Sequence, residues 1–428
     1  MPDSDSNGPL AGLRVIGFGS FIAGPMAGQI LADMGADVIK VEPIEGEPWR
    51  HHAEFMPGES RVFLPLNRGV RSVCLDLRKP EAQAALNHLV KTADAVISNH
   101  RPDTAAKLKI DYESLSKVNP KLVYVEVTGY GHKGPRGDMP GFDLIMQGFA
   151  GVVTSEGKVT PDHQPEVVWS SSFVDFSTAY AAASAVMAGV IARQRTGKGQ
   201  KCETSLFANA LNMQCMRVVR LEGKPTAAQK WHDEDLPLLK AQGASYEEQV
   251  NDYKKLTRTA IYKTYYRAYR TKDGALCLGT LAVPARLRLL EFFGLKDPRV
   301  QQPGFDDASE EGKRIAVEVQ AEFERRFSAQ TTDYWFRELR ARDIPCEPVR
   351  YIEEMPYDEQ ALANDYVITL EHEEGFRFTA PGPVIQFSGG MPARKPSPAL
   401  GQHTEGVLAD AGYSQSEIAA LITSGAAR

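Results

Sequence analysis

Short apolar runs rich in β-branched residues alternate with helix-like segments along the N-terminal part of the chain. Residues 13–17 and 37–41 are two such runs, and they flank an amphipathic segment of about a dozen residues. The alternation continues with strand-like runs at residues 71–77, 94–99 and 121–130 and a helical stretch at residues 80–93. This pattern predicts an α/β fold in which helices cover both faces of a parallel sheet, with ligands bound at the carboxyl ends of the strands.

The chain of 428 residues is too long for one ordinary compact core, so we expect at least two packed units. Residues 173–200 form an alanine-rich helical stretch that ends in a basic, glycine-containing turn. The polar residues 220–255 lack the strand pattern and indicate a boundary. We predict a large domain at residues 1–220, a linker at 221–255, a small domain at 256–340 and a C-terminal part at 341–428.

The charge balance is mildly acidic, with 49 Lys and Arg residues against 55 Asp and Glu residues and a formal net charge of −6. Such a chain supplies no field for wrapping a nucleic-acid backbone, so we expect no nucleic-acid partner. No run reaches the roughly 20 uninterrupted apolar residues that a membrane helix needs. The N-terminal segment is polar and acidic rather than signal-like. We therefore expect a cytoplasmic protein without a membrane partner.

Cysteine and histidine residues show no spacing that indicates a metal site. The five cysteines form no CxxC pair and do not cluster with histidine, so neither a disulfide framework nor a zinc site is expected. The nine histidines include no HExxH pattern. We expect no metal.

Two segments carry candidate chemistry, and each keeps two interpretations. The glycines of residues 17–28 follow a predicted strand and open a helix, so their amides could face a phosphate, or the glycines could simply allow tight packing. The spacing does not match GxGxxG, because Ile22 stands at the third glycine position. Asp175 is the one acid in an apolar stretch near the start of a helix. It could satisfy free helix amides, which the local pattern favours, or act as a carboxylate nucleophile.

Ordered motifs along the chain resemble those of the family III CoA transferases, which include the carnitine and formyl-CoA transferases. The resemblance runs from about Leu10 to Leu421. The segments that carry it are FIAGPMAGQILADMGADVIKVEP, LNRGVRSVCLDLRKPE, TGYGHKGP, PGFDLIMQGFAG, VDFSTAYAAASAVMAGVIARQRTGKGQ, DIPCEPV and LGQHTEGVL. It implies a Rossmann-like large domain and a small α+β domain, with residues 341–428 linking back to the large domain. It also implies an interlocked-ring homodimer.

The resemblance further implies a reaction and its nucleophile. Asp175 occupies the place of the aspartate that, in this family, attacks the thioester of a donor acyl-CoA. Mixed anhydride and aspartyl-CoA thioester intermediates then carry CoA to a carboxylic acid acceptor. Coenzyme A enters as the acyl-CoA substrate, and no metal is implied.

Contacts to CoA are implied by position. Lys107 stands where an arginine is usual and keeps the charge without the bidentate geometry, and Pro43 replaces an arginine of some members. Arg78 and Arg101 could instead be solvated surface charges that bind no ligand, and this interpretation stays open. The implied contact residues are Ile22, Ala23, Leu75, Asp76, Leu77, Arg78, Asn99, His100, Arg101 and Lys107.

Two other functions stay open as alternatives. An α-methylacyl-CoA racemase shares the fold but has His where this chain has Phe142. Phe142 cannot exchange a proton, which disfavours a racemase. Asp143 is then expected to be a structural or substrate-loop acid. A noncatalytic acyl-CoA-binding subunit is the second alternative, which retention of Asp175 disfavours.

The resemblance also bears on the substrate. The glycine-rich GGGG loop of the formyl-CoA transferases has no counterpart between residues 226 and 263, so oxalate and formate are disfavoured as substrates. Small-domain side chains that could meet a carboxylate, or simply form an interface, are Tyr262, Tyr265, Tyr266, Arg267 and Arg270.

Overall fold

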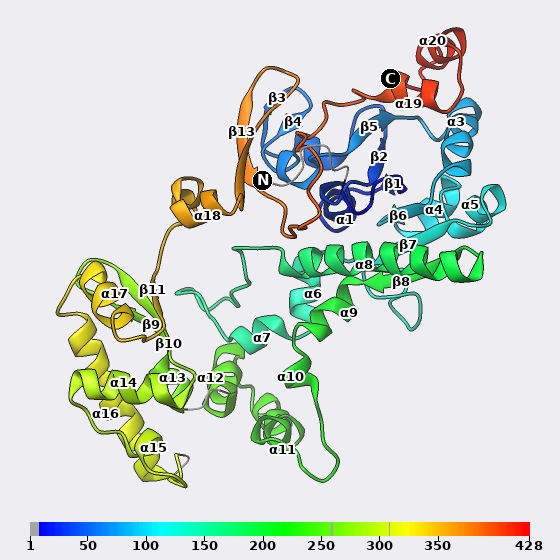
Figure 1. Ribbon diagram of the computed structural model, residues 1–428. Coiled ribbons are helices and arrows are strands. Elements are labelled where there is room, and N and C mark those ends of the chain that lie inside the picture. Colours follow the sequence, from blue (N-terminus) through cyan, green and yellow to red (C-terminus); the bar gives the residue numbers. More distant parts are fainter. Residues whose placement is uncertain (1–7, 258–259, 308) are drawn as a thin grey trace. The chain divides into compact units, whose positions relative to one another are not determined.

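The structure is a computed structural model that describes residues 8–257, 260–307 and 309–428 (Figure 1). Contacts between residues divide the described chain into two compact units. The first contains residues 8–160, 164–219 and 356–428, and the second contains residues 161–163 and 220–355 without the undescribed positions.

A six-stranded sheet forms the centre of the first unit, and every neighbouring pair of its strands is parallel. Its order is β5-β2-β1-β6-β7-β8, so strands are added on one side of β1 and then on the other, as in doubly wound folds. This confirms the predicted α/β fold with a parallel sheet. The strands are β1 (Arg14–Phe18), β2 (Asp37–Glu42), β5 (Arg71–Cys74), β6 (Ala95–Ser98), β7 (Val123–Thr128) and β8 (Gln200–Ser205).

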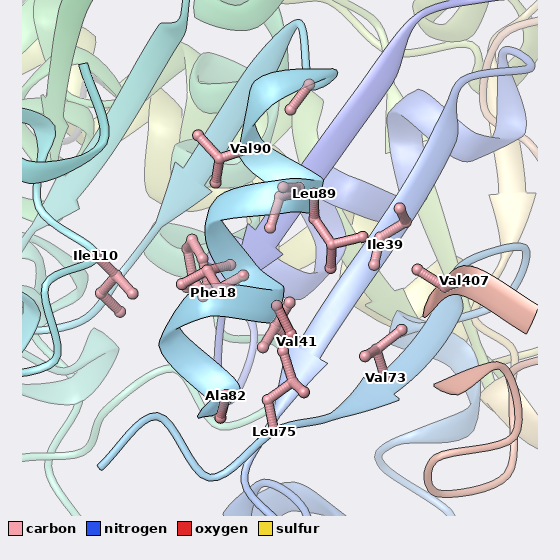
Figure 2. Close-up of a cluster of buried hydrophobic side chains, with 14 of the residues drawn as sticks. Phe18, Ile39, Val41, Val73, Leu75, Ala82, Leu89, Val90, Ile110 and Val407 are labelled. Atoms are coloured by element: carbon pink, nitrogen blue, oxygen red, sulfur yellow. The ribbon is translucent and has the colours of Figure 1, made fainter. Parts of the chain in front are cut away.

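Helices cover both faces of this sheet because alternate strand residues point to opposite sides. Ile16 and Val96 pack with α3 (Pro80–Lys91) and α5 (Tyr112–Val118) in one core, and Figure 2 shows part of it around Leu89 and Val90. The neighbouring residues Val15 and Ile97 pack on the other face with α1 (Ala23–Asp33) and α8 (Phe173–Thr196).

Helix α8 lies very close to the sheet. A Cβ on Gly189 would stand 2.4 Å from Val123 Cγ1, so only glycine permits this approach. Ala179, Ala182 and Ala183 are buried on the same side of the helix. By length and composition α8 could cross a membrane, and in this structure one face of it packs on the sheet through these small residues.

The C-terminal residues run along β5. The amide of Asp76 donates to the carbonyl of Ala426 at 2.9 Å, and Leu75 pairs with Ala427 in an isolated bridge. The remaining elements of this unit are α2 (Pro48–His51), β3 (Glu54–Met56), β4 (Glu59–Ser60), α4 (Pro102–Lys107), α6 (Asp143–Phe149), α7 (Val152–Glu156), α9 (Leu206–Asn212), α10 (Cys215–Val218), α18 (Glu359–Ala363), β12 (Val367–Glu371), β13 (Arg377–Pro381), α19 (Thr404–Asp410) and α20 (Gln415–Thr423), with a 3₁₀ helix at Leu64–Leu66 and a second, Ile352–Tyr357, at the boundary of the two units.

The second unit is built on a three-stranded antiparallel sheet with the order β11-β10-β9. Its core is rich in aromatic side chains, including Tyr269, Phe323, Phe327 and Trp335. The stretch that we expected to be a linker, residues 221–255, contains two helices of this unit, α11 (Ala227–Ala241) and α12 (Tyr246–Thr257). The other elements are α13 (Ala260–Tyr265), β9 (Tyr266–Arg270), β10 (Ala275–Gly279), α14 (Val283–Phe293), α15 (Pro298–Gln301), α16 (Glu310–Phe327), α17 (Thr332–Arg340) and β11 (Cys346–Pro348).

A buried ion-pair network joins β2 to the segment that follows it. Arg50 is fully buried and donates to both carboxylate oxygens of Glu42, at 2.8 and 2.9 Å. Glu59 lies 3.4 Å from the same guanidinium, whose face also covers the Phe63 ring at 3.7 Å. Burial raises the pKa of Glu42, but the charge and hydrogen bonds of Arg50, together with Lys40 and Ser72, hold the pKa below its usual value. Arg50 therefore balances two buried carboxylates.

Removing this guanidinium should strongly destabilise the first unit. Arg50→Met leaves Glu42 and Glu59 buried without their partner, and we expect a loss of about 3–5 kcal/mol in the free energy of unfolding, measured by urea titration. Arg314→Met is the matched control, because Arg314 pairs with Glu318 on an exposed helix face and should change stability little. Equal losses in the two variants would contradict this assignment.

Candidate active site

A cavity of about 300 Å³ opens at the carboxyl ends of β1, β6, β7 and β8, on both sides of the point where the strand order reverses. Doubly wound sheets bind their ligands at this place. Asp175 lines the cavity together with residues that directly follow the strands, so residues far apart in sequence meet there. These lining residues include Ser20, Phe21, Ala23, Asn99, His100, Arg101, Gly129, Phe142 and Leu206.

A second cavity, of about 280 Å³, lies at the carboxyl ends of β2 and β5. His100 lines both cavities, so they meet at this residue. Of the ten implied contact residues, Ala23, Asn99, His100 and Arg101 line the first cavity, and Leu75, Asp76, Leu77 and Arg78 line the second, with Pro43 beside them. Ile22 and Lys107 line neither, although Ile22 is the N-cap of α1 and Lys107 precedes Leu108 of the second cavity.

The loop from Gly19 to Ile22 is tied down by the side chains of Asn99, Lys40 and Glu47. Asn99 accepts from the Ser20 amide at 3.0 Å and donates to the Ser20 carbonyl at 2.8 Å. Lys40 donates to the Gly19 carbonyl at 2.8 Å. These tethers connect the ends of β1, β2 and β6, and the Asn99 side chain is thus engaged by the backbone rather than free for a ligand.

Phe21 occupies the most constrained position in this loop. Its φ of 65° is in the left-handed region, which a bulky side chain rarely adopts. Its amide donates to Glu47 Oε2 at 2.7 Å, and Glu47 is buried and paired with Lys40. The buried carboxylate of Glu47 therefore helps to hold an unfavourable backbone conformation at the cavity wall.

The N-terminus of α8 is capped by Asp143, the first residue of α6. Asp143 Oδ2 accepts from the amides of Val174 at 2.8 Å and Asp175 at 3.1 Å. Gln147 donates to Asp143 Oδ1 at 2.6 Å and also binds the backbone of Val168. Asp143, rather than Asp175, satisfies the free helix amides. Within the described part of the chain, the Asp175 carboxylate has no hydrogen-bond or ion-pair partner.

The surroundings of Asp175 disfavour its charge. Burial raises the pKa of this carboxyl group, the negative charge of Asp143 raises it further, and it reaches about 7. Burial and the nearby charge of Lys40 lower the pKa of His100. The cavity lining therefore contains a half-buried carboxylate poised to titrate near neutral pH and an imidazole that favours its neutral form.

One group in the described ranges has the spacing of metal ligands: Glu126, His132 and Glu203. The Lys201 ammonium lies 2.7 Å from Glu126 Oε2 and 3.1 Å from Glu203 Oε1. A lysine already neutralises these carboxylates, so the group is explained as an ion-pair cluster. The absence of a metal from the reaction stays a prediction.

The small-domain side chains named from the sequence differ in their environments. Tyr265 is fully buried, and its hydroxyl donates to Asp297 Oδ2 at 2.7 Å. Arg267 pairs with Glu324 at 3.2 Å. Tyr262, Tyr266 and Arg270 are exposed. Tyr265 is therefore a core residue of the second unit and is not open to a substrate carboxylate.

Sequence reasoning missed three residues of the site: Phe21, Gln147 and Glu47. The positive φ of Phe21 has no signal in the local pattern. A hint existed for Gln147, because it follows Asp143 by one helical turn in GFDLIMQ. Glu47 had no signal, since it acts through the backbone of a residue on another segment.

Comparison with known proteins identifies the family. The model of CoA-transferase family III matches residues 10–404. A succinate–glutarate CoA-transferase of Agrobacterium fabrum is 32% identical, over 94% of this chain and 95% of that protein. The probable fatty acyl-CoA transferase Rv3272 of Mycobacterium tuberculosis is 32% identical, over 80% of this chain and 83% of that protein.

The fold is similar to solved structures as well. A CAIB/BAIF family protein from Brucella suis has a TM-score of 0.71 and 27% identity, over 95% of this chain and 100% of that one. The sequence match and the fold agree with each other along nearly the whole chain. This chain therefore belongs to CoA-transferase family III and is a CoA-transferase.

Proposed function

We propose that Asp175 is the nucleophile that moves CoA from an acyl-CoA donor to a carboxylic acid acceptor. The observation that carries this proposal is the unpartnered, half-buried Asp175 carboxylate in the cavity at the strand ends. A carboxylate that is neither capping a helix nor paired with a cation keeps its lone pairs for attack on a carbonyl carbon.

The reaction proceeds through four balanced acyl transfers. Asp175 Oδ attacks the carbonyl carbon of the donor thioester, and the C–S bond breaks. CoA departs as the thiolate, and the acyl group stays on Asp175 as a mixed anhydride. The thiolate attacks the aspartyl carbonyl, which forms the aspartyl-CoA thioester and releases the donor acid. The acceptor carboxylate then displaces the thiolate to give a second anhydride. Finally the thiolate attacks the acceptor carbonyl, and Asp175 is freed.

CoA is proposed to extend across both cavities. The second cavity, with Leu75, Asp76, Leu77 and Arg78, takes the nucleotide end, and the thioester end reaches Asp175 in the first cavity past His100. Arg78 is exposed and paired with Asp76, so its guanidinium stands at the surface where a phosphate can reach it. Ala23, the first residue of α1, lines the first cavity, and the first-turn amides of a helix have no acceptor within the helix, so we assign the stabilisation of the oxyanion to this end of α1.

Phe142, which precedes the α8 cap Asp143, favours a transferase over a racemase. Phe142 lines the cavity and has no proton to exchange, while Asp143 is committed to the α8 amides. The interlocked homodimer and the cytoplasmic location implied earlier are retained as proposals. The relatives above are named for succinate and glutarate and for fatty acyl groups, so family membership alone does not select the acid.

Asp175→Asn should abolish transfer, with a loss of at least about 10³-fold in kcat, because the amide cannot form the anhydride. Incubation of the wild-type enzyme with acyl-CoA and hydroxylamine should convert Asp175 to its hydroxamate, detected by mass spectrometry of its peptide. CoA binding by the variant, measured by calorimetry, should stay within about threefold. Unchanged turnover by Asp175→Asn would contradict the mechanism.

The rate of aspartyl thioester formation should depend on pH through Asp175. Attack requires the ionised form, so kcat/KM at limiting donor should rise with pH to a plateau, with its midpoint near the pKa of about 7. Asp143→Asn removes a like charge and should move the midpoint down by about one unit. A midpoint that stays in place, or moves up, would show that Asp143 does not act on this carboxylate.

Stability should respond to the same group. The folded-state pKa of Asp175 lies above its unfolded value, so ionisation costs stability as pH rises between about 4 and 7. Asp175→Asn should therefore raise the free energy of unfolding at pH 8 by on the order of 2 kcal/mol, allowing for partial exposure, and by much less at pH 5. Urea titrations at the two pH values measure this, and a gain that is larger at pH 5 would contradict it.

A further inference from the structure

One wall of the Asp175 cavity is apolar and aromatic. Phe21 and Phe142 line it together with Met139 and Pro140. We call these four residues the aromatic wall. Phe142 keeps 54% of its surface exposed in spite of its apolar ring, and Met139 keeps 45%. Exposed apolar side chains that gather at a cavity are typical of a surface that binds an apolar ligand.

The aromatic wall is fixed before any substrate binds. The Phe21 ring packs edge-to-face on Trp49 at 5.2 Å and on Phe142 at 5.9 Å, and Glu47 holds its backbone. Phe142 follows Gly141, and a Cβ on that glycine would stand 2.5 Å from Gly129 Cα. This backbone contact fixes the position from which the Phe142 ring projects. The backbone positions of Phe21 and Phe142 are therefore set before a substrate binds.

Ionisable side chains in the same cavity lining are few. Of the described residues that line it, only Asp175, His100 and Arg101 have ionisable side chains. The Arg101 guanidinium donates to the Asp138 carbonyl at 3.1 Å and lies 3.4 Å from the Asp103 carboxylate. His100 is half-buried, and its pKa is lowered by this burial and by the charge of Lys40. A second carboxylate on the acyl group would have to share Arg101 with Asp138 and Asp103, and it would also face the charge of Asp175.

We infer that the site selects acyl groups with an apolar chain next to the reacting carbonyl, from monocarboxylic rather than dicarboxylic acids. This inference rests on the proposed function of Asp175. Because donor and acceptor acyl groups both form an anhydride on the same carboxylate, the preference applies to both. Phe142 is the specificity-determining side chain, since it lies at the cavity, packs on Phe21 and bears no polar atom.

Pentanoyl-CoA and glutaryl-CoA test this directly, because their acyl chains have equal length and differ only in the terminal carboxylate. The readout is the rate of hydroxylamine-dependent modification of the Asp175 peptide at limiting acyl-CoA, which requires no acceptor. For the wild-type enzyme we expect pentanoyl-CoA to react at least about 10-fold faster than glutaryl-CoA.

Two variants locate the source of the preference. Phe142→Ser should reduce the pentanoyl rate about 10-fold and the glutaryl rate less than about 3-fold, while Phe142→Leu should retain most of the preference. Leu144→Ser is the matched control, because Leu144 is a 45% exposed apolar residue of α6 outside the cavity lining. It should leave both rates unchanged.

The outcomes separate this inference from the proposed function. Modification of Asp175 that is equal or faster with glutaryl-CoA would overturn the inference while supporting the nucleophile. A pentanoyl preference that Phe142→Ser and Leu144→Ser alter equally would overturn the role of Phe142. No modification of Asp175 by either thioester would overturn the proposed function, and the inference with it.

Discussion

Two backbone amides at the N-terminus of α8 donate to a carboxylate from another helix, and the chemistry of the site depends on this cap. A helix start leaves amides that need an acceptor, and an acid in the first turn commonly supplies it. Here Asp143 supplies it from α6, at 2.8 and 3.1 Å. Asp175, in the first turn of α8, is thereby released from a structural role. Burial raises the pKa of Asp175, and the negative charge that the cap places near it raises this pKa further.

The sheet topology brings this carboxylate to the place where a ligand can meet it. Strand order reverses at β1, so the loops after β1 and β6 diverge and leave a crevice. Asn99, Lys40 and Glu47 then fix the first of these loops by four hydrogen bonds. Buried polar groups are costly unless they are paired, and here their pairing stabilises the strained backbone of Phe21. These hydrogen bonds therefore hold the loop after β1 in place, so that the cavity is formed before a ligand binds.

The parallel α/β sheet was predictable because it rests on local periodicity. Alternate residues such as Val15 and Ile16 pack on opposite faces, and both are apolar because helices cover both faces. The role of Asp175 was ambiguous for the opposite reason. Its competitor for the helix amides, Asp143, lies 32 residues earlier, and no local pattern reveals which acid forms the cap.

Other parts of the site could not be predicted from the local sequence either, because they depend on contacts between residues far apart in the chain. The aromatic wall joins Phe21 and Phe142, which are far apart in sequence, and the resemblance implied contacts by position without showing that Asn99 binds the backbone of Ser20. The helices α11 and α12 were hidden because a polar, charged segment looks like a linker when its partners are unknown.

The central claim is that Asp175 becomes covalently acylated, and oxygen transfer tests it most directly. With an acceptor acid labelled in both carboxylate oxygens with ¹⁸O, the bridging oxygen of the second anhydride stays on the aspartate when the thiolate attacks the acceptor carbonyl. A single turnover should therefore leave one ¹⁸O atom in the Asp175 peptide, seen by mass spectrometry. If CoA transfer proceeds while that peptide stays unlabelled, the carboxylate is not on the reaction path and the account is wrong.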